Sequence, residues 1–384
     1  MKRLAVIDGK SVFYRGYYAM PNLSTADGTP TGGVYGFAAL SLELVKKLKP
    51  DYVAVAWDKS KTNIRKRVAL YPEYKAGRKP APPDFYEQIP ILHELLDAFG
   101  WPLYELDDYE ADDIMGTFAR QAESRGVETC LITSDLDALQ MIGPHTHVYA
   151  LKKGFSNIEL FKPESFEAKY GIRVDQFLDF KALKGDSSDN IPGVPGVGEK
   201  TATELLQKYE TLDAIYENLW ELKDSLRRKL EEGKASAYLS RTVAEIWCDA
   251  PVELDWDVAD VADINPVKLK TMLTKLEFRS LLRSLPPNMR TDQPVDMPEL
   301  ASIEPVKLVA ADESYLVSST MAERLAVWTA GDSYYVSYEP ETTARVTFDQ
   351  LVPLLLDTEV IVHGGDELCL DILRHKQNTL PTMF

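Results

Sequence analysis

The sequence has 384 residues, 45% of them hydrophobic, which suits a globular protein of two or more domains. Its 60 acidic and 43 basic residues give a net charge of −17, which at first argues against a polyanionic partner. No apolar run is long enough for a membrane span or a signal peptide, and the three cysteines and five histidines show no metal-ligand spacing. We therefore expect a cytoplasmic protein without a membrane partner, a disulfide framework or a zinc site.

The negative charge is unevenly distributed along the chain. Residues 287–384 contain 16 acids and only 6 bases. In residues 1–286 the charge is nearly balanced once nine acids with a particular arrangement, described below, are set aside. Bound cations would offset much of the charge of those nine acids, so the net charge does not exclude a nucleic acid partner.

Residues 1–150 alternate strand-like apolar runs with amphipathic stretches. We expect strands at 4–7, 52–57, 102–106 and 130–133, and helices at 34–47, 84–99 and 111–124. This alternation is typical of a parallel α/β sheet with crossover helices. A basic segment at 59–83, which contains tyrosines and prolines, interrupts the pattern.

After residue 163, strands become scarce and helical periodicity dominates. Prolines and acids then predict a linker, and a small α/β piece follows it. The expected parts are a catalytic α/β domain at 1–162, a helical DNA-binding subdomain at 163–286, a linker at 287–303 and a C-terminal piece at 304–384.

Each predicted strand of the first domain runs directly into acidic residues. These acids are Asp8, Asp58, Glu110, Asp112, Asp113, Asp135 and Asp137. In open parallel sheets, ligand sites lie outside the carboxyl ends of the strands, so one cleft would collect all seven. A further pair, Asp186 and Asp189, lies in the segment 185–190.

So many like charges in one cleft would repel each other strongly unless cations lay among them. Hard divalent cations with oxygen ligands answer this need, and two of them could activate water and stabilise the leaving oxygen of a phosphodiester. A lone aspartate at a strand end is usually a turn former or a helix cap. Seven acids at four successive strand ends are hard to explain in that way.

Two segments suggest contact with phosphates. Residues 59–79 carry eight basic residues against one acid, and Tyr71 and Tyr74 among them offer stacking surfaces for unpaired bases. A charge run is usually only a solvated surface, but this one directly follows Asp58. Farther along, Gly193, Gly196 and Gly198 lead into a predicted helix in the pattern of a helix-hairpin-helix, whose backbone N–H groups bind phosphate without reading bases. An ordinary turn between two helices is the alternative.

Residues 1–286 closely resemble the flap endonuclease family, in particular the 5′-nuclease domain of bacterial DNA polymerase I. Seven motifs carry the resemblance in the family's order: Asp8-Gly9 with Tyr14-Arg15, and the segments 30–37, 71–78, 109–113, 133–137, 185–194 and 196–202. The resemblance implies a PIN-like α/β nuclease fold with a helical arch over the active site. It also implies a monomeric enzyme of replication and repair that removes 5′ flaps and RNA primers from flapped or nicked DNA and from RNA–DNA primer junctions.

The resemblance also implies roles for single residues. All nine acids would belong to a site for two or more Mg²⁺ or Mn²⁺ ions. Arg15, Arg67, Lys75 and Arg78 would contact phosphates near the scissile bond, and Tyr74 would bind DNA beside them. Gly193, Gly196, Gly198 and Lys200 would hold the downstream duplex, where the family often binds K⁺.

The chain departs from the family in two places. Between Asp58 and Arg67 it is slightly longer than usual. In polymerase I a 3′-5′ exonuclease-like domain and a polymerase domain follow, whereas residues 304–384 resemble only the start of the former. Asp357-Thr-Glu359 matches one motif of that exonuclease, but it follows a helix-like stretch at 348–356 and the other carboxylate motifs are not evident. We therefore expect this piece to be partial and inactive.

Two other functions are compatible with the same residues. A non-catalytic DNA-binding module would use the hairpin and the arch but would not need all nine acids. A PIN-type ribonuclease would act on RNA alone, whereas the hairpin and the long arch favour duplex DNA.

Overall fold

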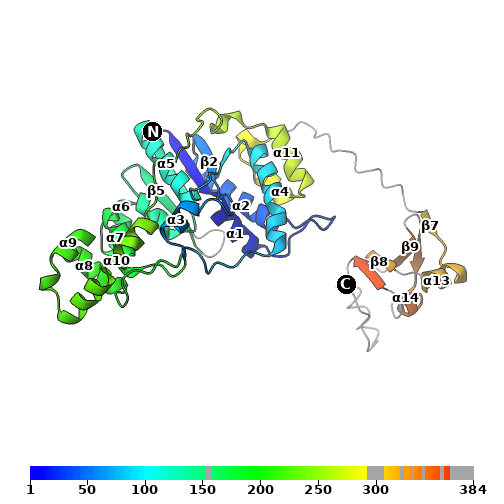
Figure 1. The fold of residues 1–384 in the computed structure, drawn as a ribbon. Coiled ribbons are helices and arrows are strands. Elements are labelled where there is room, and N and C mark those ends of the chain that lie inside the picture. The colour runs from blue at the N-terminus through cyan, green and yellow to red at the C-terminus, as the bar shows by residue number, and fades with distance from the viewer. Residues whose placement is uncertain are drawn as a thin grey trace. The chain divides into compact units, whose positions relative to one another are not determined.

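The computed structural model describes residues 1–152, 158–291, 307–320, 324–330, 333–339, 342–354 and 359–363. The chain divides into two compact units, Met1–Val295 and Asp296–Phe384 (Figure 1).

The first unit is built on a six-stranded sheet in the order β3-β2-β1-β4-β5-β6. Its strands are β1 (Arg3–Asp8), β2 (Tyr52–Ala56), β3 (Leu103–Tyr104), β4 (Glu128–Thr133), β5 (Thr146–Leu151) and β6 (Ile158–Phe161). Strands β1 to β5 are parallel, as predicted, whereas β6 runs antiparallel to β5. The sequence patterns did not indicate β5 and β6. The strand order reverses between β1 and β4, and ligand sites of open α/β sheets form at such a point.

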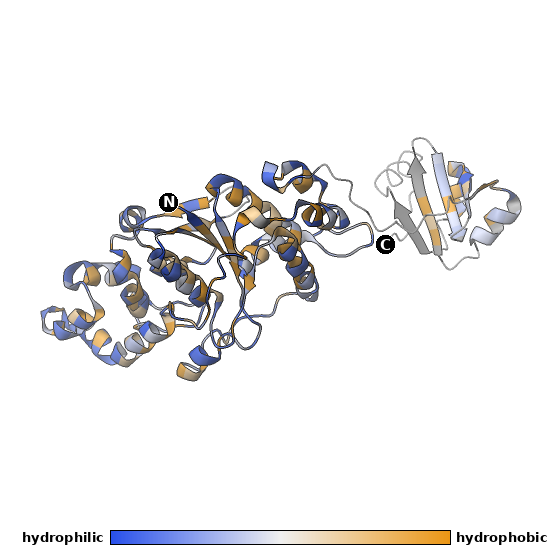
Figure 2. Ribbon diagram, turned by 90° about the horizontal axis from the view of Figure 1, so that it is seen from above, coloured by the Kyte–Doolittle hydropathy of each residue, from blue (hydrophilic) through white to orange (hydrophobic). Residues whose placement is uncertain are grey.

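Helices cover both faces of this sheet: α1 (Gly9–Ala19), α2 (Gly32–Leu48), α4 (Pro83–Phe99) and α5 (Ala111–Ser124). Successive side chains of β1 point to opposite faces, so Leu4 and Val6 pack with Phe118 of α5, whereas Ile7 packs with Phe13 of α1 on the other side. Figure 2 shows hydrophobic residues on the strands and on the helix sides that face them.

Helices α1 and α2 lie unusually close together. A Cβ atom on Gly36 would lie 2.3 Å from the Cα atom of Gly16, so neither position tolerates a side chain without separating the helices. The sequence patterns predicted α2, α4 and α5 but not α1, which begins directly at the end of β1. This tight pairing fixes the start of α1 at the carboxyl edge of the sheet.

The helical region contains α6 (Pro163–Tyr170), α7 (Phe177–Lys184), α8 (Glu199–Tyr209), α9 (Leu212–Glu217) and α10 (Asp224–Ala244). The chain then returns to the sheet, where the Val53 N–H donates to the Ala259 carbonyl at 2.9 Å. Helices α11 (Pro266–Lys275) and α12 (Arg279–Ser284) pack into the core beside α2 and α4. The segment predicted as one helical subdomain is therefore divided between two places.

The first residues of the predicted linker also belong to this core. Residues Pro287–Met289 form a 3₁₀ turn, and the Met289 side chain is buried in the same hydrophobic cluster as α11. Burial of the apolar Met289 side chain removes it from water, which favours the packing of these residues against the core.

The second unit contains β7 (Lys307–Val309), α13 (Glu313–Thr320), β8 (Arg324–Ala330), β9 (Ser333–Glu339), β10 (Thr342–Val346), α14 (Phe348–Leu354) and β11 (Glu359–His363). Its sheet has the order β11-β8-β9-β10-β7, with antiparallel pairs in the centre and parallel pairs at both edges. Leu325, Val336 and Leu351 lie in its small core. The predicted helix-like stretch corresponds to α14, whereas Asp357 lies outside the described residues.

Candidate active site

A cavity of about 850 Å³ lies at the carboxyl edge of the first unit's sheet. Seven of the nine predicted metal-site acids line it: Asp8, Asp58, Glu110, Asp112, Asp135, Asp137 and Asp186. Four basic residues share the lining, namely Lys10, Lys75, Arg78 and Lys79. The strand ends therefore bring the predicted acids to one place, as the topology of a parallel sheet requires.

Asp8 joins β1 to α1 at the floor of the cavity. Its Oδ1 atom accepts from the Ser11 N–H at 3.0 Å and caps α1, and its Oδ2 atom accepts from the Thr133 hydroxyl at 2.7 Å. Burial raises the pKa of Asp8 to about 7, and the charges of Asp58 and Asp135 add to the effect. A buried carboxyl group with a pKa this high favours a cation or a proton beside it.

The start of α5 carries the next acids. Asp58, just after β2, accepts from the Ala111 N–H and from the Asn63 amide, each at 2.9 Å. Burial opposes its charge, but the charges of Lys10 and Lys75 together with these two hydrogen bonds outweigh burial, so the pKa of Asp58 is lowered. The helix N-terminus also favours negative charge here. The start of α5 is thereby tied to the end of β2.

Asp112 has no such support. Its Oδ1 atom is buried and has no hydrogen-bond partner among the described residues. Burial raises its pKa well above the ordinary value, and the charges of Asp135 and Asp8 raise it further. A buried acceptor without a donor is costly, and a hard cation would satisfy it.

Asp135 and Asp137 follow β4 and also line the cavity. Asp135 caps the 3₁₀ helix Leu136–Met141 and accepts from the Asp137 N–H at 2.9 Å. Burial raises the pKa of Asp137 to about 6, although Lys181 opposes this shift.

Asp186 and Asp189 lie on the tight loop that follows α7. The Gly185 backbone has a φ of +76°, and a Cβ there would lie 2.7 Å from the Ile191 carbonyl oxygen. A Cβ on Gly193 would lie 2.3 Å from the Gly185 nitrogen, so this glycine closes the loop that presents Asp186. This geometry gives Gly193 a structural use, and its contact with a DNA duplex stays a prediction.

Ammonium and guanidinium groups occupy much of the space between the acids. Lys75 forms ion pairs with Glu110 and, at 3.4 Å, with Asp189. Arg78 also pairs with Asp189. Among the described residues, no group of three or more acids, histidines or cysteines is arranged to hold a metal ion directly. The donor set and the Asp112 oxygen fit a divalent cation, but the lysines and arginines now neutralise several of these acids.

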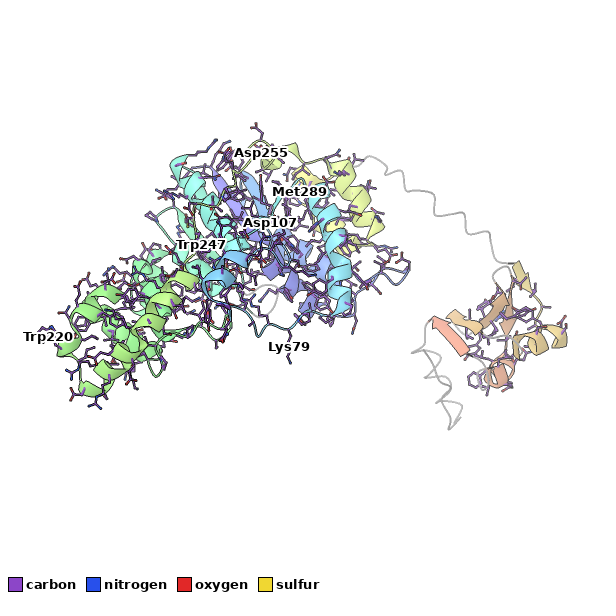
Figure 3. All side chains as sticks on the ribbon, viewed as in Figure 1. Lys79, Asp107, Trp220, Trp247, Asp255 and Met289 are labelled. Atoms are coloured by element: carbon purple, nitrogen blue, oxygen red, sulfur yellow. The ribbon has the colours of Figure 1, made fainter. Side chains whose placement is uncertain are left out.

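Arg67 and Asp113 are not among the residues that line the cavity, although Arg67 Nη1 lies 3.2 Å from Oε2 of the lining residue Glu110. Both side chains are buried, and the two guanidinium nitrogens bond the two carboxylate oxygens at 2.7 Å each. Arg67 also stacks on Trp247, which Figure 3 labels where the helical region adjoins the sheet. In this structure the two charges neutralise each other, and the contact of Arg67 with a phosphate and the binding of a metal by Asp113 stay predictions.

Three other predicted residues also lie outside the lining. Tyr74 is buried and donates its hydroxyl to Glu110 at 2.7 Å, so its ring is not exposed for base stacking. Arg15 donates to the Leu151 carbonyl at the end of β5. Asp189 is buried behind the cavity, where Lys75 and Arg78 bind it.

Sequence reasoning missed some of the lining residues. Lys10 and Tyr14 lie four residues apart on α1, and Tyr86 on α4 lies near them in the same cavity. The four-residue spacing of Lys10 and Tyr14 places both side chains on one face of a helix. The sequence patterns did not predict α1, so this spacing could not be used. Lys79, from the predicted basic segment, also lines the cavity, and Figure 3 shows it projecting from the edge of the unit.

The predicted hairpin lies between α7 and α8. Gly198 precedes α8, and open space surrounds the position where its Cβ would be. The Lys200 side chain is 90% exposed. The Gly196 carbonyl accepts from the Lys229 ammonium of α10 at 3.2 Å. The helix start is therefore accessible to a phosphate, and one hairpin carbonyl already has a cationic partner.

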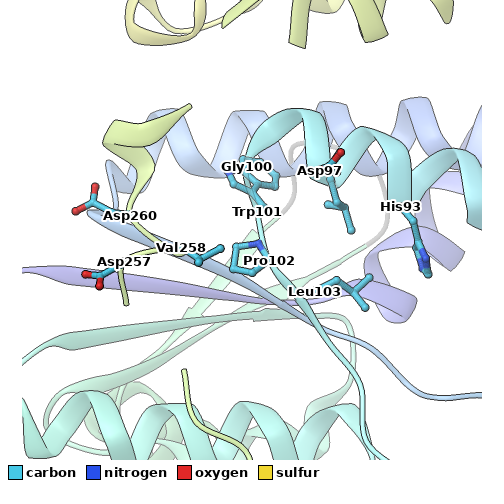
Figure 4. A pocket seen from close by; sticks show the side chains of 10 residues that line it. His93, Asp97, Gly100, Trp101, Pro102, Leu103, Asp257, Val258 and Asp260 are labelled. Carbon is cyan, nitrogen blue, oxygen red and sulfur yellow. The ribbon is translucent and has the colours of Figure 1, made fainter. Parts of the chain in front are cut away.

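A second cavity, of about 620 Å³, lies near the amino ends of β2 and β3 (Figure 4). His93 and Asp97 of α4, Trp101, and Asp257 contribute to its lining. None of the nine predicted acids is among the residues that line it. The first cavity is therefore the better candidate for an active site.

Two family models match the first unit. Residues 3–171 match the model described as 5′-3′ exonuclease, N-terminal resolvase-like domain, and residues 172–267 match that of the 5′-3′ exonuclease, C-terminal SAM fold. In the described residues, no helix is both long and apolar enough to cross a membrane.

Curated relatives agree with these matches. The chain is 40% identical over 317 residues to DNA polymerase I of Caldicellulosiruptor bescii. The matched region covers 79% of this chain and 37% of that protein. It is 37% identical over 335 residues to DNA polymerase I of Bacillus subtilis, covering 87% of this chain and 37% of that protein. The chain thus spans little more than a third of the length of these relatives.

A solved structure shares the fold. The flap endonuclease of bacteriophage T5, in a complex with DNA and metal ions, has a TM-score of 0.56 and 19% identity, covering 72% of this chain and all of that chain. This likeness confirms the predicted fold class of an α/β nuclease domain followed by a helical region.

Proposed function

The chain belongs to the 5′-3′ exonuclease family of hydrolytic nucleases, and we propose on this premise that its first unit cuts DNA at 5′ ends and 5′ flaps with divalent cations. The observation that carries the proposal is the single cavity lined by seven carboxylates, one of which has a buried oxygen without a partner. Lys10, Lys75, Arg78 and Lys79 offset part of this negative charge, and a divalent cation would offset more of it and would satisfy the Asp112 oxygen.

We propose that six acids that line the cavity belong to the cation site: Asp8, Glu110, Asp112, Asp135, Asp137 and Asp186. We propose two or more Mg²⁺ ions, with Mn²⁺ as a substitute, because carboxylate oxygens suit both. Bound cations would polarise the scissile phosphate and activate water. Asp58 and Asp189 support the site through the start of α5 and through Lys75 and Arg78.

Lys75 and Arg78 are proposed to bind the scissile phosphate. Both line the cavity, where Lys75 now pairs with Glu110 and Arg78 with the buried Asp189 behind the lining, and both would turn to a phosphate when DNA and cations bind. Arg15 is proposed to assist from the end of β5, where its guanidinium already lies. Arg67 and Asp113 instead hold the start of α5 in position.

We propose that the hairpin at Gly196–Gly198, with Lys200, binds the backbone of the downstream duplex. The exposed start of α8 offers N–H groups to a phosphate, so binding should be independent of base sequence. K⁺ binding at this hairpin would require the Lys229 ammonium to leave the Gly196 carbonyl.

The similarity to the curated polymerases supports a wider proposal. Residues 1–286 would act as the 5′-nuclease part of a DNA polymerase I, on flaps, nicks and RNA–DNA primer junctions during replication and repair. We propose a catalytic domain at 1–162 and a DNA-binding region at 163–286. Residues 304–384 would be a partial 3′-5′ exonuclease-like domain without activity. A monomeric, cytoplasmic protein fits these substrates.

A cleavage assay tests the function. A 5′-flapped duplex should be cut in Mg²⁺ and not in EDTA, and Asp135→Asn should abolish cutting while DNA binding persists. Asp257→Asn, in the second cavity, serves as the control and should cut normally. Binding without Mg²⁺-dependent cutting would favour a DNA-binding module, and preference for single-stranded RNA would favour a ribonuclease.

A further inference from the structure

Two ammonium groups connect the acids of the loop at 185–190 to the acids of the sheet. Lys75 lies between Glu110 and Asp189, and Lys181 lies between Asp137 and Asp186, with its Nζ atom 3.0 Å from Asp186 Oδ2. Each lysine therefore joins one acid of this loop to one of the acids near the strand ends. The sequence patterns identified Lys75 but not Lys181.

The two lysines reach the acids from different directions. Lys75 belongs to the basic segment at 59–79 and lines the cavity. Lys181 belongs to α7, whose neighbouring residues Phe180 and Leu183 are buried in the hydrophobic core. The Lys181 side chain is only 6% exposed, so it approaches the acids from behind the cavity wall. Lys181 does not line the cavity, so its ammonium, unlike that of Lys75, does not face bound DNA.

A buried ammonium stays in place only when opposite charges surround it. Asp137 and Asp186 supply these charges, and Asp186 is further fixed by the Ser188 N–H and hydroxyl at 2.9 and 2.6 Å. A divalent cation between the same two acids would lie within a few ångströms of the ammonium, and the repulsion would be strong in so buried a place.

We propose that Lys181 is a built-in cation of the active site, which joins Asp137 to Asp186 and excludes a divalent cation from the space between them. The inference rests on the proposed metal-dependent function. It makes Lys181 a positioning residue, and it directs tight divalent binding to the part of the cavity near Asp8, Asp112 and Asp135. Occupancy between Asp137 and Asp186 is correspondingly weak in this chain.

Mn²⁺ binding to the full chain tests this assignment without measuring activity. Titration followed by electron paramagnetic resonance counts the ions bound to the wild type and to Lys181→Met. The variant should bind one additional Mn²⁺ per chain, or bind its weakest ion at least about tenfold more tightly. Lys184→Met is the matched control, because Lys184 lies on the same helix but pairs with the exposed Glu199.

Three results separate the possibilities. Additional or tighter Mn²⁺ binding in Lys181→Met, with Lys184→Met unchanged, supports the assignment. Equal number and affinity in the wild type and Lys181→Met would overturn it while leaving the proposed function intact. Absence of Mn²⁺ binding in the wild type and in both variants would overturn the assignment of Lys181 and the proposed metal-dependent function together.

Removing Lys181 leaves two acids facing each other, so Lys181→Met could unfold in EDTA. In that case circular dichroism provides the readout. Mn²⁺ should raise the melting temperature of Lys181→Met more than that of the wild type, and Lys181→Arg, which keeps the charge, should respond like the wild type. An equal rise in Lys181→Met and the wild type would overturn the assignment.

Discussion

The guanidinium of Arg67 and the carboxylate of Asp113 form a buried, two-pronged ion pair with both N–O distances at 2.7 Å. Arg67 also donates to the carbonyls of Val243 and Glu245, and Asp113 accepts from the N–H groups of Glu110 and Trp247. The pair thus connects three segments: the helix at Arg65–Leu70, the start of α5 and the end of α10. It is one of the links between the helical region and the segments that form the carboxylate cavity.

Breaking this pair should destabilise the first unit. Arg67→Met leaves the Asp113 charge buried without its partner, and we expect the free energy of unfolding to fall by about 3–5 kcal/mol. Urea denaturation followed by tryptophan fluorescence measures it. The double variant Arg67→Met/Asp113→Leu should recover part of the loss, because no unpaired charge remains. Lys66→Met, at an exposed neighbouring position, is the control, and an equal loss there would refute the role given to Arg67.

Replacing Asp112 should change stability and activity in opposite directions. Its carboxylate is buried, its Oδ1 atom has no partner among the described residues, and its pKa is raised, so Asp112→Asn removes an unfavourable charge from the metal-free protein. We expect a higher melting temperature in EDTA together with a loss of flap cleavage of about 100-fold. A stable variant that cuts at the wild-type rate would show that Asp112 does not serve the cations.

The carboxylate cavity should make stability depend on pH and on Mg²⁺. Burial raises the pKa of Asp8 from 3.8 to about 7 and that of Asp137 from 3.8 to about 6. At a pH between 3.8 and these raised pKa values, the folded protein therefore binds more protons than the unfolded chain. The free energy of unfolding falls as the pH rises through this range toward 7. Mg²⁺ needs the charged carboxylates, so it should restore stability increasingly as the pH rises.

Calorimetric melting in EDTA and in Mg²⁺, across the range from about pH 5 to about pH 8, checks this dependence. The difference between the two melting temperatures should grow with pH. A difference that is constant or shrinks as the pH rises would contradict the proposed metal site. Asp257→Asn, which leaves the cavity intact, should show the wild-type dependence.

Lys75→Ala should separate catalysis from binding. If the Lys75 ammonium acts on the scissile phosphate, the variant should lose about 100-fold in single-turnover rate but little in affinity for a flapped duplex. Lys79→Ala, a change of the same charge at the edge of the same cavity, should show the reverse pattern, with weaker binding and a shallower dependence on salt. Equal losses of rate and affinity in Lys75→Ala would make it a simple binding contact.

The carboxylate cluster was predictable because its cause is local. A short apolar run followed by an acid indicates a strand end, and parallel strands place their carboxyl ends on one edge whatever the rest of the fold does. This reasoning located Asp8, Asp58 and Asp135 correctly with respect to one cavity. It also predicted α2, α4 and α5, whose amphipathic patterns are strong.

The partners of the charged residues could not be predicted in this way. Arg67 and Lys75 belong to the same basic run, yet one is buried against Asp113 and the other lines the cavity beside Glu110. Lys181 carries no signal in the sequence that distinguishes it from Lys184, three residues later on the same helix. Only the packing of α7 against the core decides which of the two faces the acids.

The sequence by itself determined where acids end strands, which stretches form the main helices and which family the motifs resemble. The tertiary structure alone decided which cation neutralises which acid, that α11 and α12 pack beside the sheet, and that Asp112 keeps an oxygen without a donor. The reason is physical: periodicity and strand ends depend on neighbours in the chain, whereas ion pairing and burial depend on distances between segments far apart in the sequence.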